Sequence, residues 1–139
     1  MTPLLEVCIG SVQSALAAKQ GGAARVELCA ALEIGGITPS AGLMRAVRQV
    51  EGLKMHVLIR PRGGDFLYDK AEVATMTHDI EQARLYGADG VVIGALRTDG
   101  LIDMDVCRQL ADAASGMSIT FHRAFDMCKD PLRAIQELR

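Results

Sequence analysis

The chain has 139 residues, of which 50% are hydrophobic and 23% charged, a balance that predicts one folded domain with an ordinary apolar core. Its formal net charge is -2 and it has no run of Lys or Arg, which argues against nucleic acid or an acidic lipid surface as a partner. No apolar stretch approaches the roughly 18 residues that span a membrane, and no secretory signal pattern is found at the amino terminus. The four cysteines are scattered and do not form a disulfide framework, so we expect a reducing, cytoplasmic location.

Apolar runs typical of strands alternate with stretches of helical periodicity along the whole chain, which predicts five successive βα units and a parallel sheet. The expected strands are 4–9, 25–29, 55–60, 90–93 and 118–122. Helices are expected over 12–20 with Ser11 as N-cap, from Thr38-Pro39, from a capping box at Asp69 and Glu72, near Asp103, and from Asp130-Pro131. No terminator precedes Arg139, so the last helix is expected to run to the end of the chain.

Two architectures fit five βα units: a flavodoxin-like open sheet, or the first five units of a (β/α)8 TIM barrel. An open doubly wound sheet buries both faces under helices, so its strands read as continuous apolar runs. Here the first strand divides into an apolar set, Leu5, Val7 and Ile9, and a set that contains Glu6 and Cys8. The fifth strand divides in the same way, with Ile119 and Phe121 on its apolar face. We therefore predict an α/β fold of the barrel type, with 1–139 as the amino-terminal part of a single barrel domain.

The polar set of side chains is predicted to line the inside of this sheet. Its members are Glu6, Cys8, Glu27, Cys29, His56, Arg60, Thr120 and His122. Buried carboxylates are unfavourable unless they are paired, and Arg60 or Arg62 is the expected partner of Glu6 and Glu27. A structural network of ion pairs is an alternative explanation for this polar lining.

A Glu-x-Cys repeat ends the first two strands, with Cys8 and Cys29 at equivalent positions. Neighbouring strands lie about 4.8 Å apart, so both sulfurs can reach one ion, given zinc-to-sulfur distances of about 2.3 Å. Thiolates favour Cu(I) or zinc, and His122 on the fifth strand is a third candidate ligand. The alternative is that the cysteines pack as small apolar residues, as we expect for Cys107 and Cys128.

Arginines follow the third and fifth strands, in the segments RPRGGDF and FHRAFD. The planar guanidinium suits a carboxylate or phosphate, and the glycine pair lets backbone approach a ligand. Arg60 and Arg62 are therefore candidates for binding a small anion. The alternative is a tight turn in which Arg62 bridges to Asp65. Parallel α/β folds place their sites at this end of the strands.

Five segments together resemble the CutC family. They are LLEVCIGSVQSAL, RVELCAALEIGGITPSAGLMRAV, HVLIRPRGGDFLY, YGADGVVIGAL and TFHRAFD. The resemblance implies a cytoplasmic TIM barrel linked to copper homeostasis, with copper on the strand-end Cys8 and Cys29. It also implies a ligand-binding rim of Glu6, Glu27, Arg60, Arg62, Asp65, His122, Arg123 and Asp126.

Two functions follow as hypotheses. The first is copper homeostasis, with Cu(I) bound by Cys8 and Cys29 and assisted by His122. The second is an enzyme that acts on a small anionic substrate held by Arg60 and Arg62, with Glu6, Glu27 or His122 as acid and base. A structural fragment whose polar lining pairs with itself is a third, weaker reading. Exposed edges on the first and fifth strands are expected unless a longer chain or a homo-oligomer covers them.

Overall fold

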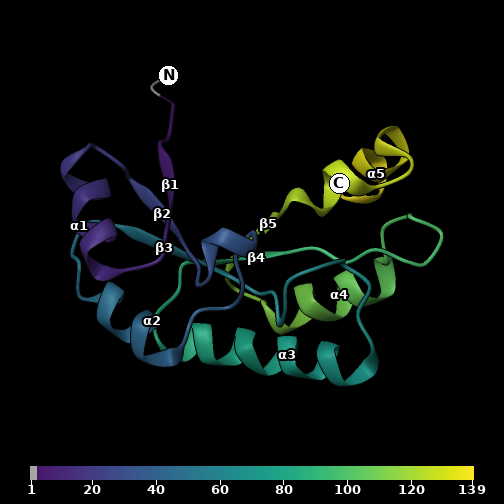
Figure 1. Ribbon diagram of the computed structural model, residues 1–139, viewed down its shortest axis with the longest axis horizontal. Coiled ribbons are helices and arrows are strands. Elements are labelled where there is room, and N and C mark those ends of the chain that lie inside the picture. The colour runs from purple at the N-terminus through teal and green to yellow at the C-terminus, as the bar shows by residue number, and fades with distance from the viewer. Residues whose placement is uncertain (1–2) are drawn as a thin grey trace.

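The computed structural model describes residues 3–139 and contains the five expected βα units (Figure 1). The strands are β1 (Glu6–Ile9), β2 (Arg25–Leu28), β3 (Lys54–Leu58), β4 (Gly90–Ile93) and β5 (Ser118–Phe121). The helices are α1 (Val12–Gln20), α2 (Ala41–Arg48), α3 (Lys70–Leu85), α4 (Met104–Ala113) and α5 (Pro131–Glu137), with 3-10 helices over Leu32–Ile34 and Arg123–Met127. None of these helices is both long and apolar enough to cross a membrane.

The five strands form one parallel sheet in the order β1-β2-β3-β4-β5. A flavodoxin-like sheet has a different order, with the second strand outside the first. The sequential order is that of a (β/α)8 barrel, so the predicted fold class is confirmed. Within residues 3–139 the sheet stays open, with β1 and β5 as its edges.

Helices α1 to α4 cover one face of the sheet and bury its apolar side chains (Figure 1). The strand residues in this core are Ile9, Val26, Leu28, Met55, Val57, Val91 and Ile93. They pack with helix residues that include Ala15, Met44, Val47, Met76, Ile80 and Leu110. Leu5 and Ile119 were expected in this layer, yet they are 50% and 45% exposed, because Leu5 directly precedes the edge strand β1 and Ile119 lies on the edge strand β5. The other face of the sheet is left free to carry polar groups.

Capping side chains fix where the helices begin. The capping box of Asp69 and Glu72 is formed as predicted, and Asp103 and Asp130 cap α4 and α5. The second helix begins later than expected, at Ala41, because Ser40 is its N-cap.

Thr38 has another role, since its hydroxyl accepts a hydrogen bond of 2.8 Å from the backbone N–H of Arg60. The predicted start of α2 was therefore wrong by two to three residues. The predicted continuation of α5 was also too long, because the helix ends at Glu137 with Leu138 as its C-cap.

The register between β1 and β2 differs from the one that the repeat suggests. Cys8 is paired with Glu27, and Glu6 with Arg25. The two Glu-x-Cys segments are thus displaced by two residues along the strands, as the stagger of a barrel sheet requires. A shift of two keeps every side chain on its predicted face. Cys8, Glu27 and Cys29 therefore share the face that is free of helices.

Gly90 at the start of β4 and Gly94 directly after its end make room for two histidine rings on that same face. A methyl group added to Gly90 would lie 2.5 Å from Nε2 of His56, and one added to Gly94 would lie 2.5 Å from Cε1 of His122. Both rings therefore lie directly over the backbone of β4. The ring of His56, on β3, and the ring of His122, which follows β5, fit there only because residues 90 and 94 have no side chain.

Candidate functional site

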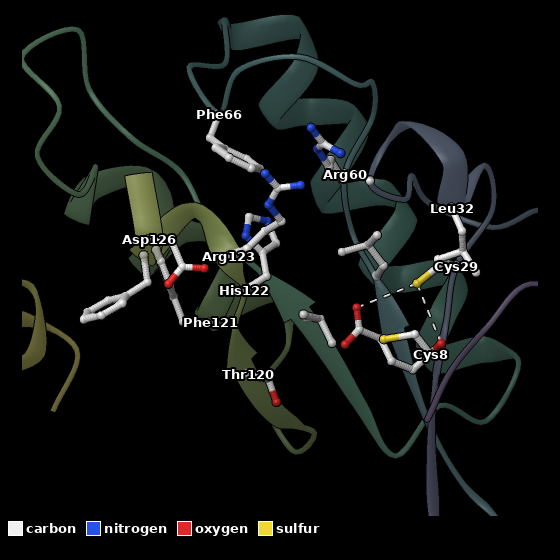
Figure 2. A pocket seen from close by; sticks show the side chains of 15 residues that line it. Cys8, Cys29, Leu32, Arg60, Phe66, Thr120, Phe121, His122, Arg123 and Asp126 are labelled. Atoms are coloured by element: carbon white, nitrogen blue, oxygen red, sulfur yellow. Dashed lines mark hydrogen bonds between the residues drawn. The ribbon is translucent and has the colours of Figure 1, made fainter. Parts of the chain in front are cut away.

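A pocket of about 520 Å³ opens on the helix-free face, at the carboxyl ends of the strands (Figure 2). Its polar and sulfur-bearing side chains are Cys8, Glu27, Cys29, Arg60, Thr120, His122, Arg123 and Asp126. The apolar part of its wall comes from Leu32, Leu58, Phe66, Val92, Phe121 and Phe125. Sulfur atoms lie at one end, whereas the nitrogens of Arg60, Arg123 and His122 gather at the other (Figure 2).

The sulfur end is built by Cys8 of β1 and Cys29, which directly follows β2. The backbone N–H of Cys29 donates to the carbonyl of Ile9 at 2.9 Å, which holds the two strand ends together. Cys8 is exposed and Cys29 is buried. The Cys29 thiol lies 3.7 Å from both the carbonyl oxygen and the Oε1 atom of Glu27 (Figure 2). One carboxylate and two thiols therefore share this end of the pocket.

Burial, and next the negative charge of Glu27, raise the pKa of both cysteines above its ordinary value. The pKa of Glu27 is raised as well, by burial and by the charge of Glu6. All three groups thus hold their protons more strongly than they would in water. A thiol end of this kind becomes ionised when a cation replaces the protons.

The nitrogen end is built by Arg60, which follows β3, and Arg123 in the second 3-10 helix. Arg60 is only 4% exposed, and its guanidinium donates to the carbonyls of Ile34, Gly36 and Gly64 at 2.8 to 3.3 Å. Its Cζ atom also lies 4.9 Å from the ring centroid of Phe66. These contacts fix the guanidinium in place beside the pocket.

Arg62 does not join Arg60, contrary to the prediction that both hold one anion. Its guanidinium binds Glu72, the Asp65 side chain at 3.1 Å and the Leu67 carbonyl at 2.7 Å, and its Cζ lies 5.3 Å from the Tyr68 ring. These partners belong to the loop before α3 and to α3 itself. The alternative reading, in which Arg62 bridges to Asp65 in a turn, is what the structure shows. Neither Arg62 nor Asp65 lines this pocket.

Glu6 is also away from the pocket wall. It forms an ion pair with Arg25, its neighbour in register on β2. The expected partner, Arg60 or Arg62, was therefore wrong. The counter-ion comes from the adjacent strand because the staggered register places Arg25 beside Glu6. Asp126 does line the pocket, as does Arg123, so these two candidates lie where the prediction puts them.

His122 is held as a neutral ring. Burial, and then the charge of Arg60, lower the pKa of His122 to about 4. Its Nδ1 accepts a hydrogen bond of 3.1 Å from the backbone N–H of Ala124, so the proton of the neutral ring is on Nε2. A protonated Nε2 cannot ligate a metal. His122 would have to break this hydrogen bond before it could join Cys8 and Cys29.

The described residues contain no group of three or more His, Cys, Asp or Glu side chains arranged to hold a metal ion. A metal at the sulfur end would therefore rest on the two thiols. Two-thiolate coordination suits a soft ion such as Cu(I), whereas zinc sites usually have four ligands. The donor set fits Cu(I) and leaves His122 without a required role.

Several residues of the site are absent from the sequence-based set. Gly35 lies close to the guanidinium groups of both arginines, Phe66 stacks on Arg60, and Gly94 leaves room for the ring of His122. Phe66 ends the RPRGGDF segment, so its neighbours already pointed to it. The pair of glycines four residues apart, Gly90 and Gly94, on a strand between two histidine-bearing strands was the available signal for the ring positions.

A family model described as the CutC family matches residues 3–139. The chain belongs to the CutC family. It is 55% identical over 136 residues to a family protein CutC of Bacteroides fragilis, a match that covers 97% of this chain and 54% of the relative. It is 51% identical over 135 residues to a human protein named copper homeostasis protein cutC homolog, with 97% of this chain and 50% of the relative covered.

A solved CutC structure has the same fold. It is the crystal structure of the putative copper homeostasis protein CutC from Streptococcus agalactiae, with a TM-score of 0.92 and 34% sequence identity. The match covers 99% of this chain and 68% of that protein. The chain thus spans about half the length of the curated CutC relatives it matches.

Proposed function

We propose that this CutC chain takes part in copper homeostasis by binding Cu(I) through Cys8 and Cys29. The observation that carries the proposal is that two thiols from neighbouring strands open into one pocket, with a carboxylate beside them. The names of the relatives support the link to copper. Cu(I) is here a bound cargo ion, and the thiols supply it with two soft ligands.

Proton release is part of this proposal. Both thiols are held in their protonated form by burial and by Glu27, so Cu(I) must displace two protons when it binds. The burial of Cys29 also keeps bulk water away from one side of the ion.

A cytoplasmic location agrees with four free cysteines and stays a prediction. The assignment of the chain to the amino-terminal part of one barrel domain also stays a prediction.

An anaerobic titration with Cu(I), in competition with a chromophoric Cu(I) chelator, tests the proposal. Wild type is expected to bind one Cu(I), and Cys8→Ser and Cys29→Ser are each expected to lose the site. Cys128→Ser is the matched control, because Cys128 is partly exposed and lies outside the pocket. Equal binding by wild type and Cys8→Ser would end the proposal.

The geometry does not favour the alternative function, an enzyme that holds an anionic substrate with Arg60 and Arg62. It requires both guanidinium groups on one ligand, and Arg62 is committed to Glu72 and Asp65.

A further inference from the structure

The nitrogen end of the pocket has more positive charge than the protein itself neutralises. Neither Arg60 nor Arg123 forms an ion pair with a carboxylate of residues 3–139. The Nε–H of Arg60 is buried and has no hydrogen-bond partner in the same part of the chain. A buried guanidinium with no counter-ion is unfavourable, and the carbonyl dipoles around Arg60 compensate only part of its charge.

The two guanidinium groups converge on a single point. A methyl group on Gly35 would lie 3.1 Å from Nη1 of Arg123 and 3.2 Å from Nη1 of Arg60. Gly35 has a φ of 90°, a conformation that favours glycine, so the backbone itself keeps this space free of a side chain. Two like charges brought together in this way repel each other unless something negative lies between or beside them.

The surroundings select the size and charge of what fits there. Phe66 covers Arg60 from one side, and His122 adds a ring beside the arginines (Figure 2). The Nε2 of His122 is buried without a hydrogen-bond partner among the described residues, and its hydrogen is a potential donor. Asp126 lines the same pocket and forms no ion pair with Arg123, so an added anion does not have to replace an internal one.

We propose that Arg60 and Arg123 form a binding site for a small oxyanion, a carboxylate or phosphate group, beside Gly35 in the pocket that holds Cys8 and Cys29 at its other end. The planar fork of Arg123 matches the oxygens of either group, and Arg60 adds its charge and an Nε–H that has no partner among the described residues. The site does not require bound copper. Its ligand is a small molecule, because the whole pocket has a volume of about 520 Å³.

Isothermal titration calorimetry with inorganic phosphate and, separately, with acetate tests this site at low salt. Wild type is expected to bind at least one of the two, and the better probe identifies a phosphate or a carboxylate as the ligand group. Arg123→Gln should weaken binding at least about tenfold, since a hydrogen-bonded charge is lost. Arg123 is exposed, so this change leaves the fold intact.

Arg108→Gln is the matched control. It removes the same charge from an exposed position on α4, where Arg108 makes only a 3.9 Å contact with Asp105. Cys8→Ser should bind the anion as wild type does, so failure of this site and failure of the copper site are distinguishable. The proposal is overturned if neither probe binds in the millimolar range, or if Arg108→Gln weakens binding as much as Arg123→Gln.

Thermal unfolding without added anion gives a second readout. Arg123→Gln should unfold at the same temperature as wild type or at a higher one, because the repulsion between two convergent cations is relieved. Phosphate or acetate should then raise the midpoint of wild type but not of the variant. A lower midpoint for Arg123→Gln in anion-free buffer would mean that Arg123 is a structural residue, and it would overturn the proposal.

Discussion

Replacing Gly94 by alanine tests whether the inner face of β4 is shaped around His122. The added methyl carbon would lie 2.5 Å from Cε1, 2.7 Å from Nδ1 and 3.1 Å from Nε2 of the ring. These contacts are far shorter than van der Waals distances, so the ring must move. It would then lose the 3.1 Å hydrogen bond that its Nδ1 accepts from Ala124.

The expected loss of stability is the difference between two effects. Overpacking a well-filled site costs about 1–3 kcal/mol. Alanine in place of glycine returns about 0.5–1 kcal/mol, because the unfolded chain has less freedom to lose. The net expectation for Gly94→Ala is therefore a loss of about 1 kcal/mol in the free energy of unfolding, and at most about 2.5 kcal/mol. Gly90→Ala should cost a similar amount through the ring of His56, which would lie 2.5 to 2.8 Å from the new methyl carbon.

Urea denaturation followed by circular dichroism measures these losses, and NMR of the ring protons reports the position of His122. Gly42→Ala is the control, because only the Ser40 hydroxyl lies within 4 Å of its new methyl carbon, at 3.9 Å. Position 42 is in α2, so alanine there should stabilise the protein by up to about 1 kcal/mol. If Gly94→Ala is as stable as Gly42→Ala and the His122 signals do not shift, the close fit over β4 is refuted.

Two further substitutions test what Glu27 and Arg62 each contribute to the site. Glu27→Gln removes a negative charge that raises the pKa of Cys8, so iodoacetamide should alkylate Cys8 at a lower pH than in wild type. An unchanged pH profile would show that the charge of Glu27 does not contribute to this pKa. Arg62→Ala should lower the free energy of unfolding by less than about 1 kcal/mol, because its partners are partly exposed. Phosphate and Cu(I) binding should stay at wild-type levels in this variant. A loss of either would show that Arg62 contributes to ligand binding in the pocket.

The sequence was sufficient to predict the elements and faces of this fold. Alternation along β1 placed Cys8 on the inner face, and the polar face that it shares with other strands favoured a barrel-type sheet over an open doubly wound one. Helix starts at Asp69, Asp103 and Asp130 followed from capping residues, since a cap is a local interaction. The start of α2 was less predictable because Thr38, a plausible cap, instead bonds the backbone of Arg60 across the loop.

The partners of the charged residues were not predictable in the same way. An ion pair between strands depends on register, and the register of parallel strands depends on the stagger of the whole sheet. Glu6 therefore pairs with Arg25 rather than with an arginine after β3. The roles of Arg60 and Arg62 depend on the path of the loop that follows them, which turns Arg62 toward α3 and leaves Arg60 under Phe66.

Electrostatics couples the two ends of the pocket if both proposals hold. Without ligands the thiols of Cys8 and Cys29 are neutral, and the arginine end is positive. Two thiolates around Cu(I) have a net charge of -1, which Arg60 and Arg123 attract across the pocket. An oxyanion bound at the arginines cancels that attraction, so anion and copper should each weaken the other by the same factor. The pocket would then hold Cu(I) most tightly when its arginine end is free of anions.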